Sequence, residues 1–159
     1  MKEEFVLSQL NYLESLHDSE ITSLYIENNK LILVIDDVCP PTPEMSAYQA
    51  NSGVTRKLKA VYHFPFELDR WTSCVTIIYY KSIFSLNKVT DMTLADFVTF
   101  YKNKSKSKKG FRIEILHQFF DEKWCEINGI VHDSSGCIAD ASIRFYCSKI
   151  EYFWEEVKR

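Results

Sequence analysis

The sharpest candidate for chemistry in this chain is the pair His17-Asp18. An imidazole beside a carboxylate could orient a general base or contribute to a metal site. The pair lies where a predicted N-terminal helix passes into the first predicted strand. At such a joint Asp18 could instead cap backbone N–H groups while His17 fills the space between helix and sheet. No second acid or nucleophile follows at a diagnostic spacing, so the structural interpretation is favoured. The pair remains a candidate functional site.

The other three histidines favour structural roles. His117 alternates with apolar residues of a predicted strand, which indicates a histidine bonded to a backbone carbonyl in the core. His63 shares a face with two lysines and is expected at the surface, and His132 lies at a predicted hairpin tip. A zinc site would need Cys125, His132 and Cys137 to converge, and their spacing matches no standard ligand pattern. We therefore predict no catalytic residue, no metal site and no cofactor.

Glycine usage excludes several enzyme classes. The chain has four glycines, none of them clustered, whereas phosphate-binding loops and dinucleotide fingerprints need glycines close together. It also contains neither a G-x-S-x-G elbow nor an H-E-x-x-H motif. The sequence therefore favours a protein that is not an enzyme.

The bulk composition is typical of one folded domain, and we expect residues 1–159 to form it. The 159 residues are 46% hydrophobic and 14% aromatic, enough for a sizeable core. A net charge of −3 gives no reason to expect nucleic acid or an anionic membrane as a partner. The Met1-Lys-Glu-Glu start shows no apolar signal segment, and no apolar run reaches membrane-spanning length.

Cysteine usage points to a reducing compartment. Five scattered cysteines are an odd number without a C-x-x-C motif, which favours reduced thiols in a cytoplasm. Cys137 and Cys147 alternate with the apolar residues of one predicted strand. Both are therefore expected to be buried.

Residues 21–36 predict a β-hairpin with a defined register. Asn28-Asn29 is placed at the tip, because Asn tolerates the positive φ angles of a type I′ turn. One face of the hairpin then becomes almost wholly apolar, and a slip of one residue would scatter that face. The resulting register pairs Glu27 with Lys30, Ile26 with Leu31, Leu24 with Leu33 and Thr22 with Ile35.

The remaining patterns predict an α+β fold with a mostly antiparallel sheet of seven to eight strands. Residues 3–15 have the apolar spacing of a helix, and Thr93 is the expected N-cap of an internal helix over about 93–102. Residues 149–158 fit both a helix and a strand, and their aromatic and β-branched content favours the strand. Because strands follow strands directly, antiparallel pairing is expected. The other strands are expected over 54–66, 74–83, 111–119, 124–131 and 137–147.

Two segments are predicted to be loops. Residues 39–53 contain three prolines, which a hydrogen-bonded ladder does not tolerate, and loops of this length are often functional or loosely ordered. Residues 102–109 hold five lysines and predict a solvated loop. Docking of these lysines to an acidic partner is a second interpretation.

The entry Leu16-His-Asp-Ser-Glu-Ile21 resembles a motif of small bacterial proteins, many of them uncharacterised. These proteins share an aromatic residue or Leu, then His-Asp, Ser or Ala, any residue, and Ile or Val before their first hairpin. The similarity covers residues 16–36. Some of these proteins look like immunity proteins that neutralise toxins in bacterial competition. The resemblance implies a stoichiometric binding protein with no catalytic residues.

Three functions are compatible with these patterns. The first is a cytosolic, non-catalytic module that binds another protein, and specifically an immunity-type inhibitor of a bacterial toxin. The second is a small-molecule-binding protein or enzyme with a pocket near His17, Asp18 and the 39–53 loop. The third is a homo-oligomeric structural subunit. For the first, the candidate partner-binding residues are Tyr48 and Trp71, with Tyr101 and Trp154 as further aromatic anchors.

Overall fold

The computed structural model describes residues 2–6, 16, 18–36, 54–80, 88–107, 110–121 and 123–158. They form one ten-stranded sheet and one helix, with the strands in the order β1-β10-β4-β3-β2-β7-β8-β9-β5-β6. Every pairing is antiparallel, as predicted, but the sheet has more strands than the seven to eight expected. The elements are β1 (Lys2–Val6), β2 (Ser19–Glu27), β3 (Lys30–Asp36), β4 (Val54–His63), β5 (Ser73–Tyr79), β6 (Lys88–Met92), α2 (Leu94–Ser107), β7 (Arg112–Asp121), β8 (Trp124–Asp133), β9 (Gly136–Tyr146) and β10 (Lys149–Lys158).

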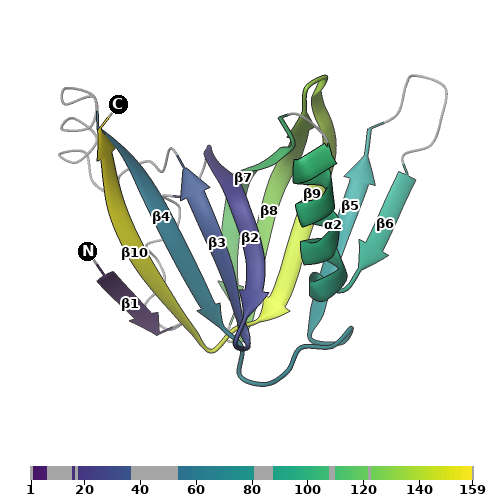
Figure 1. Cartoon of the computed structure of the whole chain (residues 1–159). Helices are drawn as coiled ribbons and strands as arrows, with labels where there is room; N and C mark the ends of the chain where they lie inside the picture. The colour runs from purple at the N-terminus through teal and green to yellow at the C-terminus, as the bar shows by residue number, and fades with distance from the viewer. Residues whose placement is uncertain are drawn as a thin grey trace.

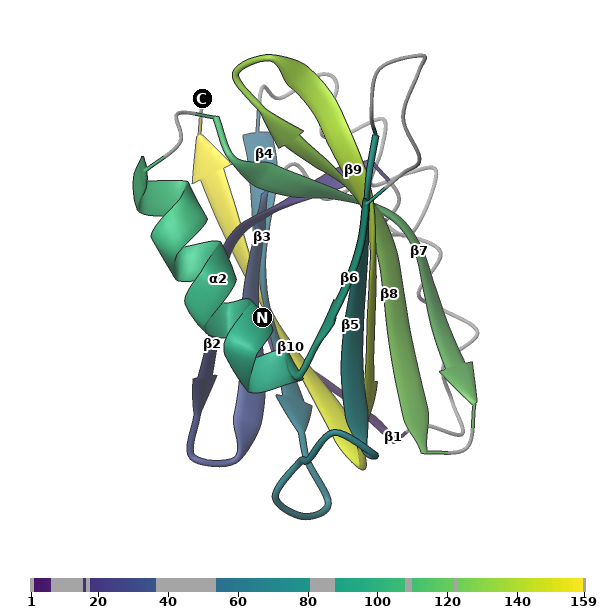
Figure 2. The same ribbon diagram turned by 90° about the vertical axis from the view of Figure 1, so that its right-hand side faces the viewer.

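The sheet is strongly bent, so that its two halves face one another (Figure 1). Seen from the side, β2, β3, β4 and β10 lie opposite β5, β8 and β9, and α2 lies along the open side between the halves (Figure 2). The helix contacts β2, β5 and β9, which places it against both halves. A bent sheet and one helix thus enclose a single interior.

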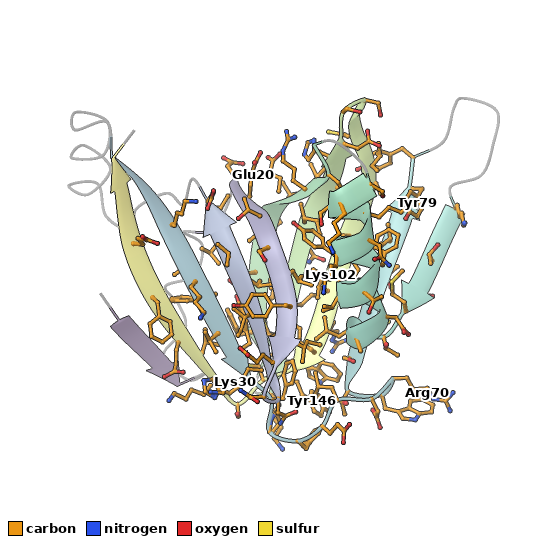
Figure 3. All side chains as sticks on the ribbon, in the orientation of Figure 1. Glu20, Lys30, Arg70, Tyr79, Lys102 and Tyr146 are labelled. Carbon is orange, nitrogen blue, oxygen red and sulfur yellow. The ribbon has the colours of Figure 1, made fainter. Side chains whose placement is uncertain are left out.

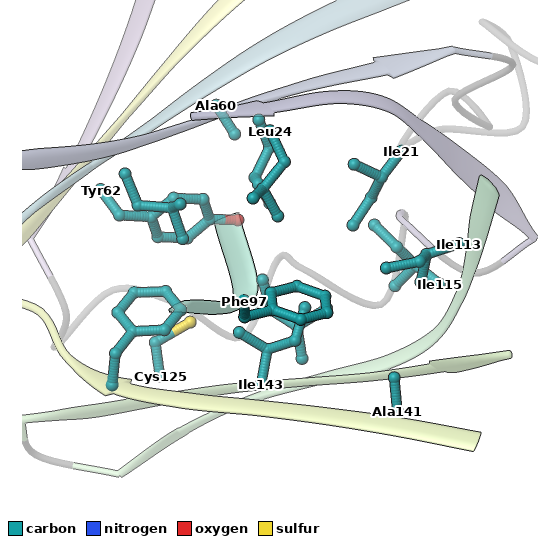
Figure 4. Packing of buried hydrophobic residues seen from close by; sticks show 14 of the residues in the cluster. Ile21, Leu24, Ala60, Tyr62, Phe97, Ile113, Ile115, Cys125, Ala141 and Ile143 are labelled. Atoms are coloured by element: carbon teal, nitrogen blue, oxygen red, sulfur yellow. The ribbon is translucent and has the colours of Figure 1, made fainter. Parts of the chain in front are cut away.

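The core fills the space between the two halves. Leu24, Ala60 and Tyr62 from one half face Cys125 and Ile143 from the other, with Phe97 of α2 beside them (Figure 4). Aromatic rings meet edge to face across the interior, as in the pair of Tyr62 and Phe145 with 5.4 Å between centroids. The alternation of apolar residues along each strand supplies this inner face.

The predicted β2–β3 hairpin is confirmed. Asn28 and Asn29 have φ angles of 49° and 59°, the left-handed conformation that a type I′ turn requires. The register pairs Glu27 with Lys30, Ile26 with Leu31 and Leu24 with Leu33, as predicted. The pairing of Thr22 with Ile35 is wrong, because a bulge at Thr22 sets Ile21 opposite Ile35 and Ser23 opposite Val34.

The predicted helix over 3–15 is wrong where the structure describes it. Lys2–Val6 form the edge strand β1, which pairs along β10 from Phe153 to Lys149. Main-chain bonds to a neighbouring strand outweigh the weak helical pattern of so short a segment. Residues 7–15 lie outside the described residues. The expectation of a strand over 149–158 is confirmed as β10.

The internal helix begins where predicted and ends later. Thr93 caps α2, since its Oγ1 accepts a hydrogen bond from the Asp96 N–H at 3.1 Å and donates one to the Asp96 carboxylate at 2.8 Å. The helix continues to Ser107 through lysines predicted to form a loop, because lysine is a good helix former and its charge suits a helix C-terminus. No helix in the described ranges combines the length and the apolar character of a membrane span.

A β-bulge in β7 makes the prediction of a core His117 wrong. The bulge lies between Ile115, which pairs with Gly129, and His117, which pairs with Asn128. Beyond it the strand changes face, so His117 is exposed, and Gln118 donates a hydrogen bond from Nε2 to the hydroxyl of Tyr62 at 2.7 Å. One inserted residue thus exchanges the inner and outer positions of half a strand.

A second bulge makes the predicted burial of Cys137 wrong. The pairing of β8 with β9 shifts between Val131 and His132, which sets Cys137 opposite His132. Cys137 is exposed, whereas Cys147, further along the chain, is buried as predicted. The predicted alternation therefore holds from Ala139 to the end of β9 and fails at Cys137, on the other side of the bulge.

Candidate functional site

The structure describes one member of the predicted His17-Asp18 pair. Asp18 is exposed and has a φ angle of 64°, and its N–H donates a hydrogen bond to the Ile115 carbonyl at 2.9 Å. Asp adopts the left-handed conformation more readily than most residues. Asp18 thus turns the chain into β2 and fixes that turn to β7. His17 lies outside the described residues, so a functional role for the pair stays a prediction.

The predicted aromatic anchors have different surroundings. Trp71 is 75% exposed, in the loop 64–72 between β4 and β5. Tyr101 is buried in the core, so its assignment as an exposed anchor is wrong. Tyr48 and the 39–53 loop lie outside the described residues, as does the side chain of Trp154.

The turn that carries Trp71 is held in shape by Asp69. The Asp69 carboxylate accepts hydrogen bonds from the N–H groups of Trp71 and Thr72 at 2.8 and 3.0 Å. These bonds, with that of the Thr72 hydroxyl, lower the pKa of Asp69. The Arg70 guanidinium lies 4.9 Å from the centroid of the Trp71 ring. An ordered turn therefore presents an indole that the protein leaves largely uncovered.

An apolar pocket of about 590 Å³ lies at this end of the molecule. Lys30 and Arg70 mark the end in Figure 3, on the side opposite Glu20 and Tyr79. Three elements contribute to the pocket: the tip of the β2–β3 hairpin, the residues from Phe64 to Ser73, and the start of α2. We call these three elements with their pocket the hairpin end. The pocket is lined by Ile26, Asn29, Phe64, Glu67, Leu68, Ser73, Thr93, Leu94 and Ala95.

Hydrogen bonds join the elements of the hairpin end. The Asn29 carbonyl accepts from the Phe64 N–H at 3.2 Å, and the Asn29 side-chain amide donates to the Phe64 carbonyl at 3.3 Å. The Asp69 carbonyl accepts from both the N–H and the hydroxyl of Ser73 at 2.9 Å. The pocket walls are therefore fixed by local bonds before any ligand binds.

The described lining of this site combines apolar side chains with Glu67 and a few neutral polar groups, and neither histidine nor cysteine is among these residues. Among the residues that the structure describes, no three His, Cys, Asp or Glu side chains are placed to hold a metal ion. The hairpin end offers apolar contact area and an exposed indole, which are features of recognition surfaces.

The sequence predicted Trp71 as a binding residue but not the pocket beside it. Ile26, Phe64 and Leu94 have the patterns of core residues, and Phe64 and Leu94 are indeed buried, whereas Ile26 is 37% exposed. Alternation predicts which apolar residues share the inner face of the sheet, but not which of them lie at an uncovered end. A cue was the spacing from the Asn28-Asn29 turn, which places Ile26 beside the hairpin tip.

Comparisons of this chain with protein-family models, with curated proteins and with solved structures found no match. The resemblance of residues 16–36 to immunity-like proteins therefore stays a prediction.

Proposed function

We propose that this protein is a non-catalytic module that binds another protein through its hairpin end. The observation that carries the proposal is Trp71, 75% exposed on a turn that Asp69 holds in place, in a loop whose other residues line an apolar pocket. We further propose an immunity-type inhibitor that acts in the cytoplasm of a bacterium and binds a toxin stoichiometrically.

The energetics of recognition support this surface. A tryptophan buries roughly 150–250 Å² when a partner covers it, and such residues dominate many interfaces. Phe66 and Ile26 at the same end are 44% and 37% exposed, and they add apolar area around the indole. Because the turn is already ordered, binding loses little conformational entropy there.

The charge of the chain favours a basic partner. The net charge is −3, although five lysines lie between residues 102 and 109, so the rest of the chain is more acidic than the whole. Toxins that cut nucleic acids are expected to be basic, and an acidic inhibitor would be steered towards them.

The test measures binding to the toxin domain encoded beside this gene, by isothermal titration calorimetry. We expect a one-to-one complex, and Trp71→Ala should weaken it by about 30-fold, which corresponds to about 2 kcal/mol. The matched control is Phe119→Ala, which removes another exposed aromatic on the outer face of β7 and should leave affinity unchanged. Equal effects of the two substitutions, or no toxin gene beside this one, would contradict the proposal.

A small apolar ligand is the second candidate, favoured by the pocket volume. About 590 Å³ lies within the range of small-molecule sites. Ala95 lines the pocket whereas Trp71 does not, so two variants separate the candidates. Ala95→Leu should block a small ligand such as anilinonaphthalene sulfonate, and Trp71→Ala should leave its binding intact. For a protein partner, Trp71→Ala should cause the larger loss of affinity and Ala95→Leu the smaller one.

A further inference from the structure

A cluster of reactive side chains lies at the end of the sheet opposite the hairpin end. His132 Nδ1 is 3.5 Å from Cys137 Sγ, and His132 Nε2 is 2.9 Å from Glu114 Oε2. We call these three residues the thiol cluster. They come from the adjacent strands β9, β8 and β7, near Glu20 and Tyr79, which mark this end in Figure 3.

The hydrogen bonds define the direction of proton transfer. A carboxylate can only accept from Nε2, so the imidazole tautomer that satisfies both contacts carries its proton on Nε2. Nδ1 is then an acceptor, and the Cys137 S–H donates to it. A nucleophile, a base and an acid that orients the base are the parts of an activated thiol. Glu114 and Cys137 bind different ring nitrogens, so the three side chains cannot converge on one metal ion.

Burial differs along the thiol cluster in a way that suits reactivity. The side chains of His132 and Glu114 are 11% and 28% exposed, whereas Cys137 is exposed. The base is therefore shielded from solvent while the nucleophile is open to a reagent. The exposure of Cys137 follows from the bulge that sets it opposite His132.

The charges around the thiol cluster are only partly compensated, because Glu20 has a cationic partner whereas Asp140 is hydrogen-bonded to a phenol. The Arg112 guanidinium lies 2.6 Å from the Glu20 carboxylate, and the Tyr80 hydroxyl donates to Asp140. Burial and the Asp140 contact raise the pKa of Tyr80 to about 12, so Tyr80 is neutral near pH 7. Among the residues that the structure describes, the charged and titratable groups beside the cluster on its neighbouring elements are Glu20 on β2, Arg112 on β7, Asp133 on β8, Asp140 on β9 and Tyr80 after β5.

We propose that Cys137 is a reactive thiol that exchanges with low-molecular-weight disulfides, with His132 as its base and Glu114 as a positioning residue. The Sγ proton passes to His132 Nδ1, and the thiolate attacks one sulfur of the disulfide. A new S–S bond forms on Cys137 while the old one breaks, and the released thiolate takes the proton from the imidazolium. Cys137 is oxidised to a mixed disulfide, and one half of the reagent is reduced to a thiol.

The chain contains its own controls for this proposal. Cys74 is also exposed, but its described contact is the Thr76 hydroxyl at 4.0 Å, which is no base. Cys125 and Cys147 are buried, and burial raises the pKa of both thiols, that of Cys147 to about 12. Four thiols of one molecule thus provide three environments.

The experiment treats the full chain with bis(2-hydroxyethyl) disulfide, an uncharged reagent, and follows each cysteine by peptide mass spectrometry. Near pH 7, Cys137 should react about tenfold faster than Cys74. On acidification, the Cys137 rate should begin to fall at a lower pH than the Cys74 rate does. His132→Gln should reduce the Cys137 rate to about that of Cys74 and move its pH profile upward. Glu114→Gln should give a smaller reduction. The Cys74 rate and the protection of Cys147 should not change, which reports an intact fold.

The measurement on the unaltered protein can overturn the proposal without any variant. Rates for Cys137 and Cys74 within about twofold of one another, with the same pH profile, would show that the cluster does not activate its thiol. A folded His132→Gln protein with an unchanged Cys137 rate would likewise exclude His132 as the base. The proposal is independent of the function proposed for the hairpin end.

Discussion

The two ends of this bent sheet present functional groups by different means. At the hairpin end the β2–β3 register is regular from Ser23 to the Asn28-Asn29 turn, and apolar side chains line a pocket there. At the opposite end, which holds the thiol cluster and which we call the thiol end, a shift in the β8–β9 register brings the exposed Cys137 into contact with His132. One end offers apolar area, and the other offers a hydrogen-bonded row of reactive groups.

This difference shows how a β-sheet separates binding from reactivity. Regular alternation can only place apolar residues inside and polar residues outside. A bulge changes which residues share a face, at the cost of a local bend in its strand and a local break in the ladder. The two ends should therefore respond separately to local substitutions and together to damage in the shared core.

The largest expected effect would disturb both ends at once. Phe97 of α2 is fully buried and packs against Phe100 and Tyr101, with 6.2 and 6.4 Å between ring centroids. Phe97→Ala should cost about 3–5 kcal/mol in the free energy of unfolding, measured with urea. Phe119→Ala, at a side chain that is 55% exposed, should cost about 0.5 kcal/mol or less. Similar costs for the two would contradict the assignment of Phe97 to the shared core.

The next effect should be confined to the thiol end. A Cβ added at Gly129 would lie 2.4 Å from the Glu114 carbonyl oxygen and 2.9 Å from Ile113 Cγ2. Gly129→Ala must therefore shift the β7 backbone that carries Glu114, at a cost of about 1–3 kcal/mol. The reactivity of Cys137 should change while binding at the hairpin end does not.

Gly136→Ala is the control for Gly129→Ala. A Cβ at Gly136 meets nothing within 4 Å, so its cost comes only from the φ angle of 110°. That cost should be about 1–3 kcal/mol, from backbone strain alone. A Gly129→Ala protein as stable to urea as the unaltered protein would contradict the crowding at Gly129.

The features that could be predicted from the sequence are local. The Asn28-Asn29 turn, the hairpin register from Leu24 to the turn and the Thr93 cap each depend on residues close together in the chain, and each is confirmed. Trp71 was identified as a binding candidate from its residue type alone, and its exposure was not encoded in any pattern. The strand over 149–158 was predicted because its residue types favour strands.

The features that were missed depend on distant partners. Lys2–Val6 is a strand because the edge of β10 is available to it, and no local pattern reports that edge. The bulges that expose His117 and Cys137 exist only as mismatches between paired strands. The thiol cluster unites residues of three strands, and the expected alternation had placed Cys137 on the inner face. Non-local register is therefore the information that the sequence patterns lack.

A smaller effect concerns the anchor of α2 near the thiol end. The Tyr101 hydroxyl donates a hydrogen bond to the Ile21 carbonyl at 2.6 Å. Tyr101→Phe removes that bond inside the protein and should cost about 1–2 kcal/mol in the free energy of unfolding near pH 7. Urea denaturation measures the cost.

The same substitution should change the response to alkaline pH. Burial raises the pKa of Tyr101 to about 12, with a smaller contribution from Glu20. The folded protein therefore holds this proton more tightly than the unfolded chain, whose tyrosines ionise near pH 10. Stability from Tyr101 is present below about pH 10 and is lost as the pH rises towards 12. The difference in the free energy of unfolding between the unaltered protein and Tyr101→Phe should therefore be smaller by about 1 kcal/mol at about pH 11. A constant difference would contradict the buried phenol.

The smallest effect concerns the anchor of α2 at the hairpin end. Thr93→Ala removes the side chain that caps the Asp96 N–H, and it should cost about 1 kcal/mol in the free energy of unfolding. The matched control is Thr99→Ala in the exposed middle of the same helix, where alanine is the better helix former and should stabilise by a few tenths of a kcal/mol. Because Thr93 lines the pocket, its loss should also weaken binding at the hairpin end, whereas the rate of Cys137 should stay the same. A changed Cys137 rate in the Thr93 variant would mean that α2 couples the two ends, and the separation between them would fail.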